Sequence, residues 1–290
     1  MPDNKNVFSP DSCGVKGLSD SKAENHTQEK TSLFADGLSV FDIFGDSSFP
    51  YVVAAPSWVI PGTVVENCRY LEGRVDEVGL LFFETAASLA YTEEDLPADL
   101  AETGLSFHIH HPLDLPWHES AAKVARIMNL LASKAAHLNP VAHVLHPPKA
   151  GPCAGILLAD LAKEFRGTSI DSENVFIENI KDNSLEDNID VIRDCGFKVC
   201  LDLGHMQAYG QQKLLDREDV WDLVAMLHLN GPGVGGRHES LEKLDKPGVK
   251  LLDCFFEKFI KGGTVTVEVF EQNGFFKSLQ YLANRHGEAR

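Results

Sequence analysis

Histidines and carboxylates recur at the ends of short apolar runs in the later part of the chain. Six successive runs end in this way, and the residues concerned include His108, His110, His143, His146, Glu178, Asp202, His205, His228 and Glu268. Burying a carboxylate among Val, Ile and Phe side chains is unfavourable unless the carboxylate is paired or binds a metal ion. Imidazole and carboxylate ligands together suit Zn²⁺, Mn²⁺ or Fe²⁺. The pattern therefore predicts a metal site.

Each of these residues has a structural alternative when it is taken alone. A single core histidine is more often a hydrogen-bonded structural residue, and a carboxylate at a strand end often forms only an ion pair. The chain contains 12 histidines. Six successive runs that all end in a potential ligand are improbable by chance, so the joint pattern favours metal binding.

The apolar runs themselves are short, β-branched and aromatic, which is typical of buried strands. They begin about 20 to 40 residues apart, which leaves room for one helix between each pair. We expect eight strands: Tyr51 to Ala55, Val75 to Glu84, Leu105 to His110, Val141 to His146, Val175 to Ile180, Val199 to Leu203, Val224 to Leu229, and Thr264 to Phe270.

Several intervening segments carry helical signals. Apolar residues repeat at helical spacing within Ser120 to Leu138, within Leu158 to Phe165, and within Val249 to Ile260. In a fourth segment Ser184 is the expected N-cap, and Gly196 follows the expected end. Strand and helix therefore alternate along the chain.

Strand followed by helix, eight times, implies parallel strands joined by right-handed crossovers. An open doubly wound sheet would offer a glycine-rich turn after its first strand, but Ala55-Pro56-Ser57-Trp58 stands there. We therefore predict an α/β fold with a single (β/α)₈ TIM barrel, which needs roughly 250 residues. The active site of such a barrel lies at the carboxyl ends of its strands, where the histidines and carboxylates fall.

The first 48 residues differ from the rest in composition. They are rich in Ser, Asp, Asn, Lys and Gly, and such segments cannot bury enough apolar surface to fold alone. We expect residues 1–48 to be a disordered or loosely docked extension, and residues 49–290 to be the catalytic barrel. The short apolar stretch Leu38 to Phe41 is the part that could dock.

Composition and charge exclude some classes of function. The formal net charge of −17 argues against nucleic-acid binding, which depends on Lys and Arg, although bound metal ions can still attract a phosphate. No apolar run reaches the ~18 residues of a membrane span, and the N-terminus has no apolar signal-peptide core. None of the six cysteines forms a C-x-x-C pair, so we expect reduced thiols in a cytoplasmic protein.

Residues 50–285 resemble the xylose-isomerase-like barrel superfamily, which includes endonuclease IV and many sugar isomerases and epimerases. In that superfamily the order His, His, Glu, Asp-x-x-His, His, x-His, Glu supplies the metal ligands. The matching residues here are His110, His146, Glu178, Asp202, His205, His228, His238 and Glu268. The resemblance implies two or three divalent metal ions, with Mn²⁺, Zn²⁺ or Fe²⁺ as candidates.

Two short segments are similar to those of one subgroup, the cobamide-remodelling phosphodiesterases. These segments are His108 to Trp117, which contains Pro112-Leu113-Asp114-Leu115-Pro116, and Gly235 to Leu241. Members of that subgroup open the nucleotide loop of B₁₂-type cofactors at its phosphodiester. The resemblance implies a small-molecule phosphodiester substrate, a cobamide. The alternative for Pro112 to Trp117 is a rigid loop that only shapes the barrel rim.

The chain departs from endonuclease IV at one position. Endonuclease IV has an aspartate two residues before the histidine of its seventh-strand loop, and here that position is Gly236. A third metal ion would then rest on His205 and His238 with solvent or substrate oxygens.

The main hypothesis is metal-dependent phosphodiester hydrolysis, with Glu178, Glu268 and His238 as catalytic residues. His110 and His146 would hold one metal ion, while Asp202, His228 and Glu268 would hold a second. His108, Asn230 and Arg237 are the expected substrate-binding residues. An ion-activated water would attack phosphorus in line.

Three alternatives remain open from the sequence. A sugar or sugar-phosphate isomerase or epimerase would use Glu178 and Glu268 as acid and base around one metal ion. DNA repair would need a basic groove, which a net charge of −17 disfavours. A non-catalytic cobamide- or sugar-binding protein would bind its ligand without turnover.

Overall fold

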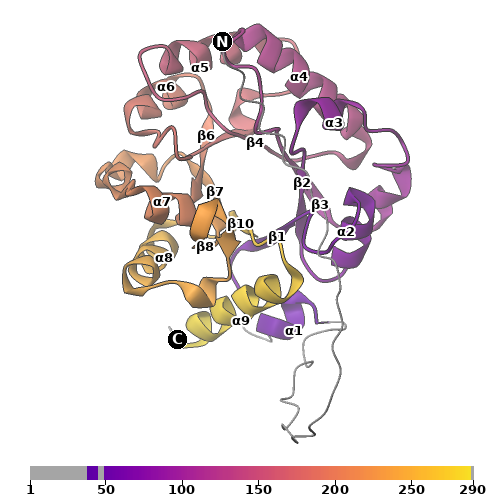
Figure 1. The fold of residues 1–290 in the computed structure, drawn as a ribbon, viewed down its shortest axis with the longest axis vertical. Coiled ribbons are helices and arrows are strands. Elements are labelled where there is room, and N and C mark those ends of the chain that lie inside the picture. The colour runs from indigo at the N-terminus through magenta and orange to yellow at the C-terminus, as the bar shows by residue number, and fades with distance from the viewer. Residues whose placement is uncertain (1–37, 45–48, 289–290) are drawn as a thin grey trace, which may run out of the picture. The chain divides into compact units, whose positions relative to one another are not determined.

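The eight expected strands close into one barrel in the computed structural model, which describes residues 38–44 and 49–288. All neighbouring pairs are parallel, in the order β1-β10-β7-β6-β5-β4-β3-β2, and helices surround them (Figure 1). The predicted (β/α)₈ barrel is confirmed. Its strands are β1 (Val52–Pro56), β2 (Glu77–Leu81), β3 (Ser106–His110), β4 (His143–Leu145), β5 (Val175–Glu178), β6 (Lys198–Asp202), β7 (Val224–Leu229) and β10 (Thr264–Val267).

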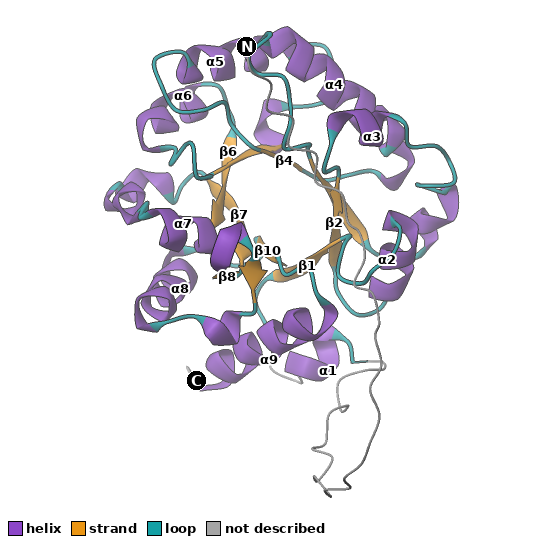
Figure 2. Ribbon diagram, viewed as in Figure 1, coloured by secondary structure: helices purple, strands orange, loops and turns teal. Residues whose placement is uncertain are grey.

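Each strand overlaps its expected run, and the two differ only in the residues at which the strand begins or ends. An additional antiparallel pair, β8 (Gly231–Pro232) and β9 (His238–Glu239), follows β7 and carries His238. The helices of the described residues are α1 (Val40–Phe44), α2 (Val64–Leu71), α3 (Thr85–Leu89), α4 (Ala121–Lys134), α5 (Ala154–Glu164), α6 (Ile189–Asp194), α7 (Leu203–Tyr209), α8 (Lys246–Lys258) and α9 (Gln272–Glu288). Figure 2 shows them as an outer layer around the strands.

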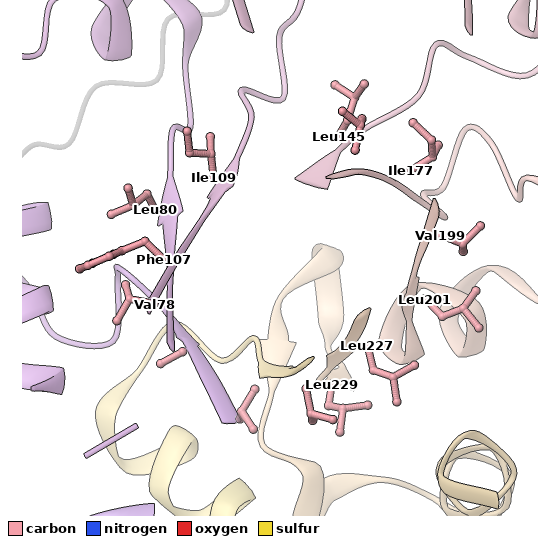
Figure 3. Packing of buried hydrophobic residues seen from close by; sticks show 14 of the residues in the cluster. Val78, Leu80, Phe107, Ile109, Leu145, Ile177, Val199, Leu201, Leu227 and Leu229 are labelled. Atoms are coloured by element: carbon pink, nitrogen blue, oxygen red, sulfur yellow. The ribbon is translucent and has the colours of Figure 1, made fainter. Parts of the chain in front are cut away.

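Alternation along the strands separates two sets of side chains. Residues such as Phe107, Ile109 and Leu227 point away from the barrel interior toward the helices (Figure 3). Successive side chains of a strand point to opposite faces, so the residues between them point inward. His108, His110 and His228 belong to that inward set. The barrel interior thus carries the titratable side chains, and the apolar core lies between strands and helices.

The expected N-cap at Ser184 was wrong. The α-helix begins five residues later, at Ile189, after a 3₁₀ turn over Glu186–Asn188. The side-chain carbonyl of Asn183 accepts hydrogen bonds from the Leu185 backbone N–H at 2.9 Å and from the Asn188 side chain at 3.2 Å. Asn183 therefore provides the local turn-forming bond that the sequence pattern assigned to Ser184.

Two other helices begin at side-chain caps. The Ser120 hydroxyl accepts from the Lys123 backbone N–H at 3.1 Å, as expected for α4. The Asp245 carboxylate accepts from the Gly248 N–H at 2.9 Å, so α8 starts at Lys246 and not at the expected Val249. A proline in the first turn of α8 needs no hydrogen bond there.

Part of the expected N-terminal extension is folded onto the barrel. Phe44 of α1 is buried and stacks on Phe49 with ring centroids 4.4 Å apart. Phe49 also meets Phe256 of α8 at 5.9 Å. Residues 1–37 and 45–48, for which disorder is expected, lie outside the described residues. Within the described part, no helix is both long and apolar enough to cross a bilayer.

Candidate metal centre

All eight residues expected to bind metal lie at the carboxyl ends of the strands or in the loops that follow. They come from β3, from the loop after β4, from β5, β6, α7, β7 and β9, and from the segment after β10. The ligand atoms of seven of them form three overlapping groups within 4.8 Å: His110 with Glu178 and His228; Asp202 with His205 and His238; and Glu178 with Asp202, His228 and Glu268. His146 is in none of these groups, but its Nε2 lies 3.2 Å from Glu178 Oε2. The sequence-predicted site residues are therefore brought together.

Glu178 lies at the centre of the cluster and is buried. Its Oε2 lies 3.1 Å from His110 Nε2 and 3.2 Å from His146 Nε2. Its Oε1 lies 3.4 Å from His205 Nδ1 and 3.5 Å from His228 Nδ1. The two oxygens of one carboxylate thus face different imidazoles, which is the arrangement that a bridging ligand would need.

Glu268 closes the other side of the cluster. Its Oε2 lies 3.3 Å from His238 Nδ1 and 3.4 Å from His228 Nδ1, and its Oε1 lies 3.9 Å from His110 Nε2. Glu268 follows β10, which is hydrogen-bonded to β7 with Thr266 opposite His228. The parallel register therefore places this carboxylate over the histidine of the neighbouring strand.

Asp202 is fully buried and has its orientation fixed by two donors. Its Oδ1 accepts from the His205 backbone N–H at 2.5 Å and caps α7, and its Oδ2 accepts from the Asn230 amide at 2.8 Å. A Cβ at Gly204 would lie 1.8 Å from the Asn230 side-chain oxygen. The Asp202-Leu203-Gly204-His205 step thus combines a ligand, a helix cap and the space that Asn230 needs.

Three of the histidines have one ring nitrogen held by a backbone carbonyl. His110 Nδ1 donates to the His111 carbonyl at 3.1 Å, His205 Nδ1 to the Asn179 carbonyl at 3.0 Å, and His238 Nδ1 to the Glu268 carbonyl at 2.9 Å. Such a bond fixes the neutral tautomer and leaves Nε2 as the ligand atom. These carbonyls are an outer shell that the motif order did not indicate.

Asn179 ties two ligand strands together and is itself fully buried. Its side-chain oxygen accepts from the Asp202 N–H at 2.7 Å, and its amide donates to the Asp202 carbonyl at 3.1 Å and to Gln211 at 2.9 Å. These bonds hold the end of β6 beside β5, so Asp202 and Glu178 keep their relative position.

The donor set fits divalent metal ions on an independent observation. Nδ1 of His228 and Oε2 of Glu268 are buried, lack hydrogen-bond partners among the described residues, and lie 3.4 Å apart. Two ligands of a tetrahedral zinc ion, each bonded at ~2.1 Å, lie about 3.4 Å from one another. Orphaned polar atoms are costly in a protein interior, and a shared cation would satisfy both.

The carboxylates and imidazoles of the cluster shift one another's pKa values. Burial raises the pKa of Glu178, but the charges of His146 and His228 outweigh burial and hold that pKa well below its usual range. Burial likewise raises the pKa of Glu268, and His228 and His238 hold it well below. Both carboxylates are therefore ionised at neutral pH.

The histidines show the complementary effect. Burial lowers the pKa of His205, but Asp202 and Glu178 raise it to about 10. Burial also lowers the pKa of His238, while Glu268 raises it to about 9. Burial also lowers the pKa of His228, but Cys200, Glu268 and Glu178 hold it well above its usual value. Cations are thus favoured throughout the cluster, and metal ions would replace the protons.

The three expected substrate-binding residues lie in different places. His108 is buried inside the barrel below the mouth, with Nδ1 2.6 Å from Glu77 Oε1. A Cβ at Gly79 would lie 2.5 Å from its ring. Asn230 is buried on Asp202, so it orients a ligand. Arg237 is exposed beside His238 and lines a neighbouring cavity of about 410 Å³.

Gly236, which replaces the aspartate of endonuclease IV, is exposed on the loop between β8 and β9. It adopts φ +81°, in the left-handed region that favours glycine. The loop therefore turns through a glycine at this point, and Asp202, His205 and His238 form the third group of potential ligands without an additional carboxylate.

A cavity of about 240 Å³ opens above the cluster. Its polar lining includes His110, His146 and Glu178, and its apolar lining includes Phe83, Leu113 and Phe270. The sequence interpretation did not select these apolar residues. The available signal was that Trp58 and Phe83 follow β1 and β2, which end at Pro56 and Leu81.

Comparison with protein-family descriptions and with curated protein sequences finds no match. Solved structures do match. A D-tagatose 3-epimerase-like protein superposes with a TM-score of 0.60 at 14% identity, over 82% of this chain and 97% of that one. Endonuclease IV from Thermus thermophilus gives 0.60 at 20%, over 82% and 99%. The IolI protein with a bound zinc atom gives 0.55 at 11%, over 82% and 95%.

The chain shares the fold of xylose-isomerase-like barrels. A further match, a xylose isomerase domain protein from Planctomyces limnophilus, has a TM-score of 0.55 at 16% identity over 82% of this chain and 97% of that one. The barrel fold expected from the alternation of strands and helices is thus found among known structures, which include both epimerases and an endonuclease.

Proposed function

We propose that this protein is a metal-dependent phosphodiesterase of the xylose-isomerase-like barrel type. One observation carries the proposal: Oε2 of Glu178 lies 3.1 Å from His110 Nε2 and 3.2 Å from His146 Nε2, while its Oε1 lies 3.5 Å from His228 Nδ1, in the other main group of potential ligands. Enzymes that transfer phosphoryl groups commonly clamp the attacking and leaving oxygens between two metal ions. A carboxylate that bridges two ions suits that chemistry better than a mononuclear reaction.

The ligands divide between two main positions and a weaker third. His110 and His146 would hold one ion with Glu178, and Asp202, His228 and Glu268 would hold another. His205 and His238 would complete a third position with Asp202 or contact the phosphate. When bound, divalent ions supply Lewis acidity to phosphoryl oxygens and lower the pKa of water.

The chain's own groups orient the substrate and position protons. Glu178 and Glu268 remain ionised because the surrounding imidazoles lower their pKa values, so they balance the charge of the ions. His238 donates from Nδ1 to the Glu268 carbonyl at 2.9 Å, which aims Nε2 at the cavity. From there it can contact a phosphate oxygen, with the exposed guanidinium of Arg237 beside it.

A cobamide is the proposed substrate, and the loop after β3 supports it. This loop holds the segment that resembles cobamide-remodelling phosphodiesterases. Its Trp117 indole donates to the His146 carbonyl at 3.1 Å, and its Asp114 accepts from the Thr85 N–H at 2.7 Å. The segment therefore buttresses one proposed ligand and ties neighbouring loops together at the mouth, where Leu113 lines the cavity.

The test is incubation of the Mn²⁺- or Zn²⁺-loaded protein with adenosylcobalamin and with bis(p-nitrophenyl) phosphate, followed by mass analysis. We expect fragments that correspond to an opened nucleotide loop, and release of p-nitrophenol. Glu178→Gln should abolish both reactions, and Ile260→Ala, at an exposed residue after α8, should not. If protein with confirmed bound metal leaves both substrates intact, the proposal is rejected.

The second candidate is a sugar epimerase or isomerase. The observation that favours it is the placement of Glu178 and Glu268 at 3.5 and 3.4 Å from the same atom, Nδ1 of His228. Two carboxylates on one ion could act as acid and base. Metal analysis distinguishes the candidates, because one tightly bound ion per chain favours epimerisation and two or three favour phosphodiester cleavage.

A further inference from the structure

Large apolar side chains are exposed on one side of the barrel mouth. Trp58, Phe83 and Leu113 have exposed fractions of 42%, 37% and 57%, and they follow β1, β2 and β3 respectively. These strands are neighbours in the barrel, in the order β1-β2-β3. Because the strands are parallel neighbours, their loops meet at the same part of the mouth. Clustered exposed apolar groups in a concave site mark a ligand surface.

The aromatic rings form a continuous chain from the surface to the metal centre. Trp58 meets Phe83 edge to face at 5.5 Å between ring centroids, and Phe83 meets Phe270 at 6.2 Å. Phe270 stacks on His238 at 4.9 Å with 25° between the rings. An apolar group bound along this chain would end next to a proposed metal ligand. We call the three aromatic residues Trp58, Phe83 and Phe270, together with the aliphatic Leu113, the aromatic wall.

Three of the four wall residues share a cavity with the proposed ligands, and Trp58 lies outside its lining. Phe83, Leu113 and Phe270 line the same space of about 240 Å³ as His110, Glu178 and His238. Beyond Leu113 lies a second space of about 500 Å³, whose lining also includes Leu113 and His146. The region next to the ligands is thus larger than a phosphate alone requires, and one of its sides is apolar.

The chemistry of the wall narrows what can bind. Its four side chains offer a single hydrogen-bond donor, the indole N–H of Trp58, and no acceptor. Such a surface cannot itself pair the hydroxyl groups of a sugar, so it provides no polar selection for one. Flat apolar groups gain both from stacking on aromatic rings and from leaving water.

We propose that the aromatic wall binds a large, flat, apolar group carried by the phosphodiester substrate and thereby selects the substrate. The inference rests on the proposed phosphodiesterase function. It assigns recognition of such a group to the side of β1 and β2. The metal-binding side holds the phosphate, and the wall distinguishes one ester from another.

The kinetic test uses two diesters with the same leaving group, methyl p-nitrophenyl phosphate and pyrenylmethyl p-nitrophenyl phosphate. We expect the metal-loaded protein to prefer the pyrenylmethyl ester by at least about tenfold in kcat/KM. Trp58→Ala and Phe83→Ala should each lower this preference about threefold to tenfold. Ile260→Ala is the matched control, because that residue is 67% exposed and precedes β10 at the opposite end of the barrel.

A binding test separates failure of the wall from failure of the function. Pyrenylmethylphosphonate should bind the metal-loaded protein at least about tenfold more tightly than methylphosphonate, and Phe83→Ala should reduce the difference. If the pyrenyl ligand binds tightly and this depends on the wall, but neither diester is cleaved, the binding role of the wall is supported and the phosphodiesterase function is rejected. Cleavage of both diesters at equal kcat/KM, or equal binding of both phosphonates, overturns the wall. Circular dichroism of each variant checks that it is folded.

Discussion

The two sides of the barrel mouth are built from the same kind of strand but end in opposite chemistry. Strands β3 to β7, the loops after them and the segment after β10 present imidazoles and carboxylates, with distances of 3.1 to 3.9 Å between them. Strands β1 and β2 are followed by Trp58 and Phe83, which are exposed. The charged groups of the first side compensate one another's charges, whereas each apolar side chain of the second side makes its contacts independently.

This difference has an energetic consequence. A buried carboxylate or imidazole of the cluster is tolerable only because its partners compensate its charge, so removing one disturbs all. A ring of the aromatic wall contributes its own contact area, and its loss affects little else. Substitutions should therefore have large, shared effects on the metal-binding side and small, separate effects on the aromatic side.

The largest effect is expected for Glu178→Gln. The amide can no longer bridge two cations, so turnover should fall by about 10³-fold or more, in line with lost charge stabilisation in a transition state. Metal content, measured by mass spectrometry, should fall with it. Glu84→Gln is the control, since Glu84 is an exposed carboxylate after β2. A Glu178→Gln protein with full metal content and a tenth of the activity would contradict the bridging role.

Asn230→Ala should have an intermediate effect. The Asn230 amide orients Asp202 through a 2.8 Å hydrogen bond, and loss of such an outer-shell partner typically weakens metal affinity about 10-fold to 100-fold. Competition with a chelating dye measures the affinity. Asn273→Ala, on the exposed face of α9, should leave it unchanged. Undiminished affinity in Asn230→Ala would show that Asp202 needs no such support.

Leu113→Ala should have a smaller effect, confined to recognition. Leu113 is 57% exposed and lines the cavity, so we expect KM for a large apolar diester to rise about threefold to tenfold. Metal content should equal that of the parent protein, because Leu113 contacts no proposed ligand through a hydrogen bond. A loss of metal in this variant would mean that the two sides are not separate.

The smallest effect is a pH dependence of the metal-free protein. The pKa values of His205 and His238 are about 10 and about 9, above the ordinary 6.5, so their ion pairs stabilise the folded state fully below pH 6.5. That contribution is lost as the pH rises through about 9 to 10. We expect the Tm of chelator-treated protein to fall by a few degrees between pH 7 and 10.

The pH dependence of Tm in metal-loaded protein is the comparison for this measurement. In loaded protein the imidazoles are neutral ligands, so the fall in Tm between pH 7 and 10 should be smaller, and metal affinity should rise with pH. His205→Gln should flatten the curve of the metal-free protein. His118→Gln, at a side chain 82% exposed, should not. A flat curve in the parent protein would show that these histidines are not protonated there.

The sequence by itself determined the barrel and the order of its potential ligands. Strand length, alternation and the type of residue at each strand end are local properties, and parallel strands in a barrel bring their carboxyl ends to one place. His110, Glu178, Asp202 and His228 could therefore be assigned to one site from the chain alone. Helix starts were less certain, as Ser184 shows, because several nearby side chains compete to form the same cap.

Only the tertiary structure decided how deep each polar side chain lies in the barrel and which side chains it contacts. His108 and His110 share a strand face, yet only His110 lies at the candidate metal centre. His108 contacts Glu77 inside the barrel, because Gly79 on the adjacent strand leaves room for its ring. The side chain of Asn230 likewise reaches Asp202 through the space left by Gly204 of α7. No local pattern encodes a gap supplied by a distant residue.

The aromatic wall depends most completely on the fold. Trp58, Phe83 and Phe270 are far apart in the chain, and each alone is an ordinary aromatic residue after a strand. They meet because the barrel closes with β1 between β10 and β2. Closure is a property of the whole sheet, so the sequence supplied the side chains and only the closed barrel made them one surface beside the metal ligands.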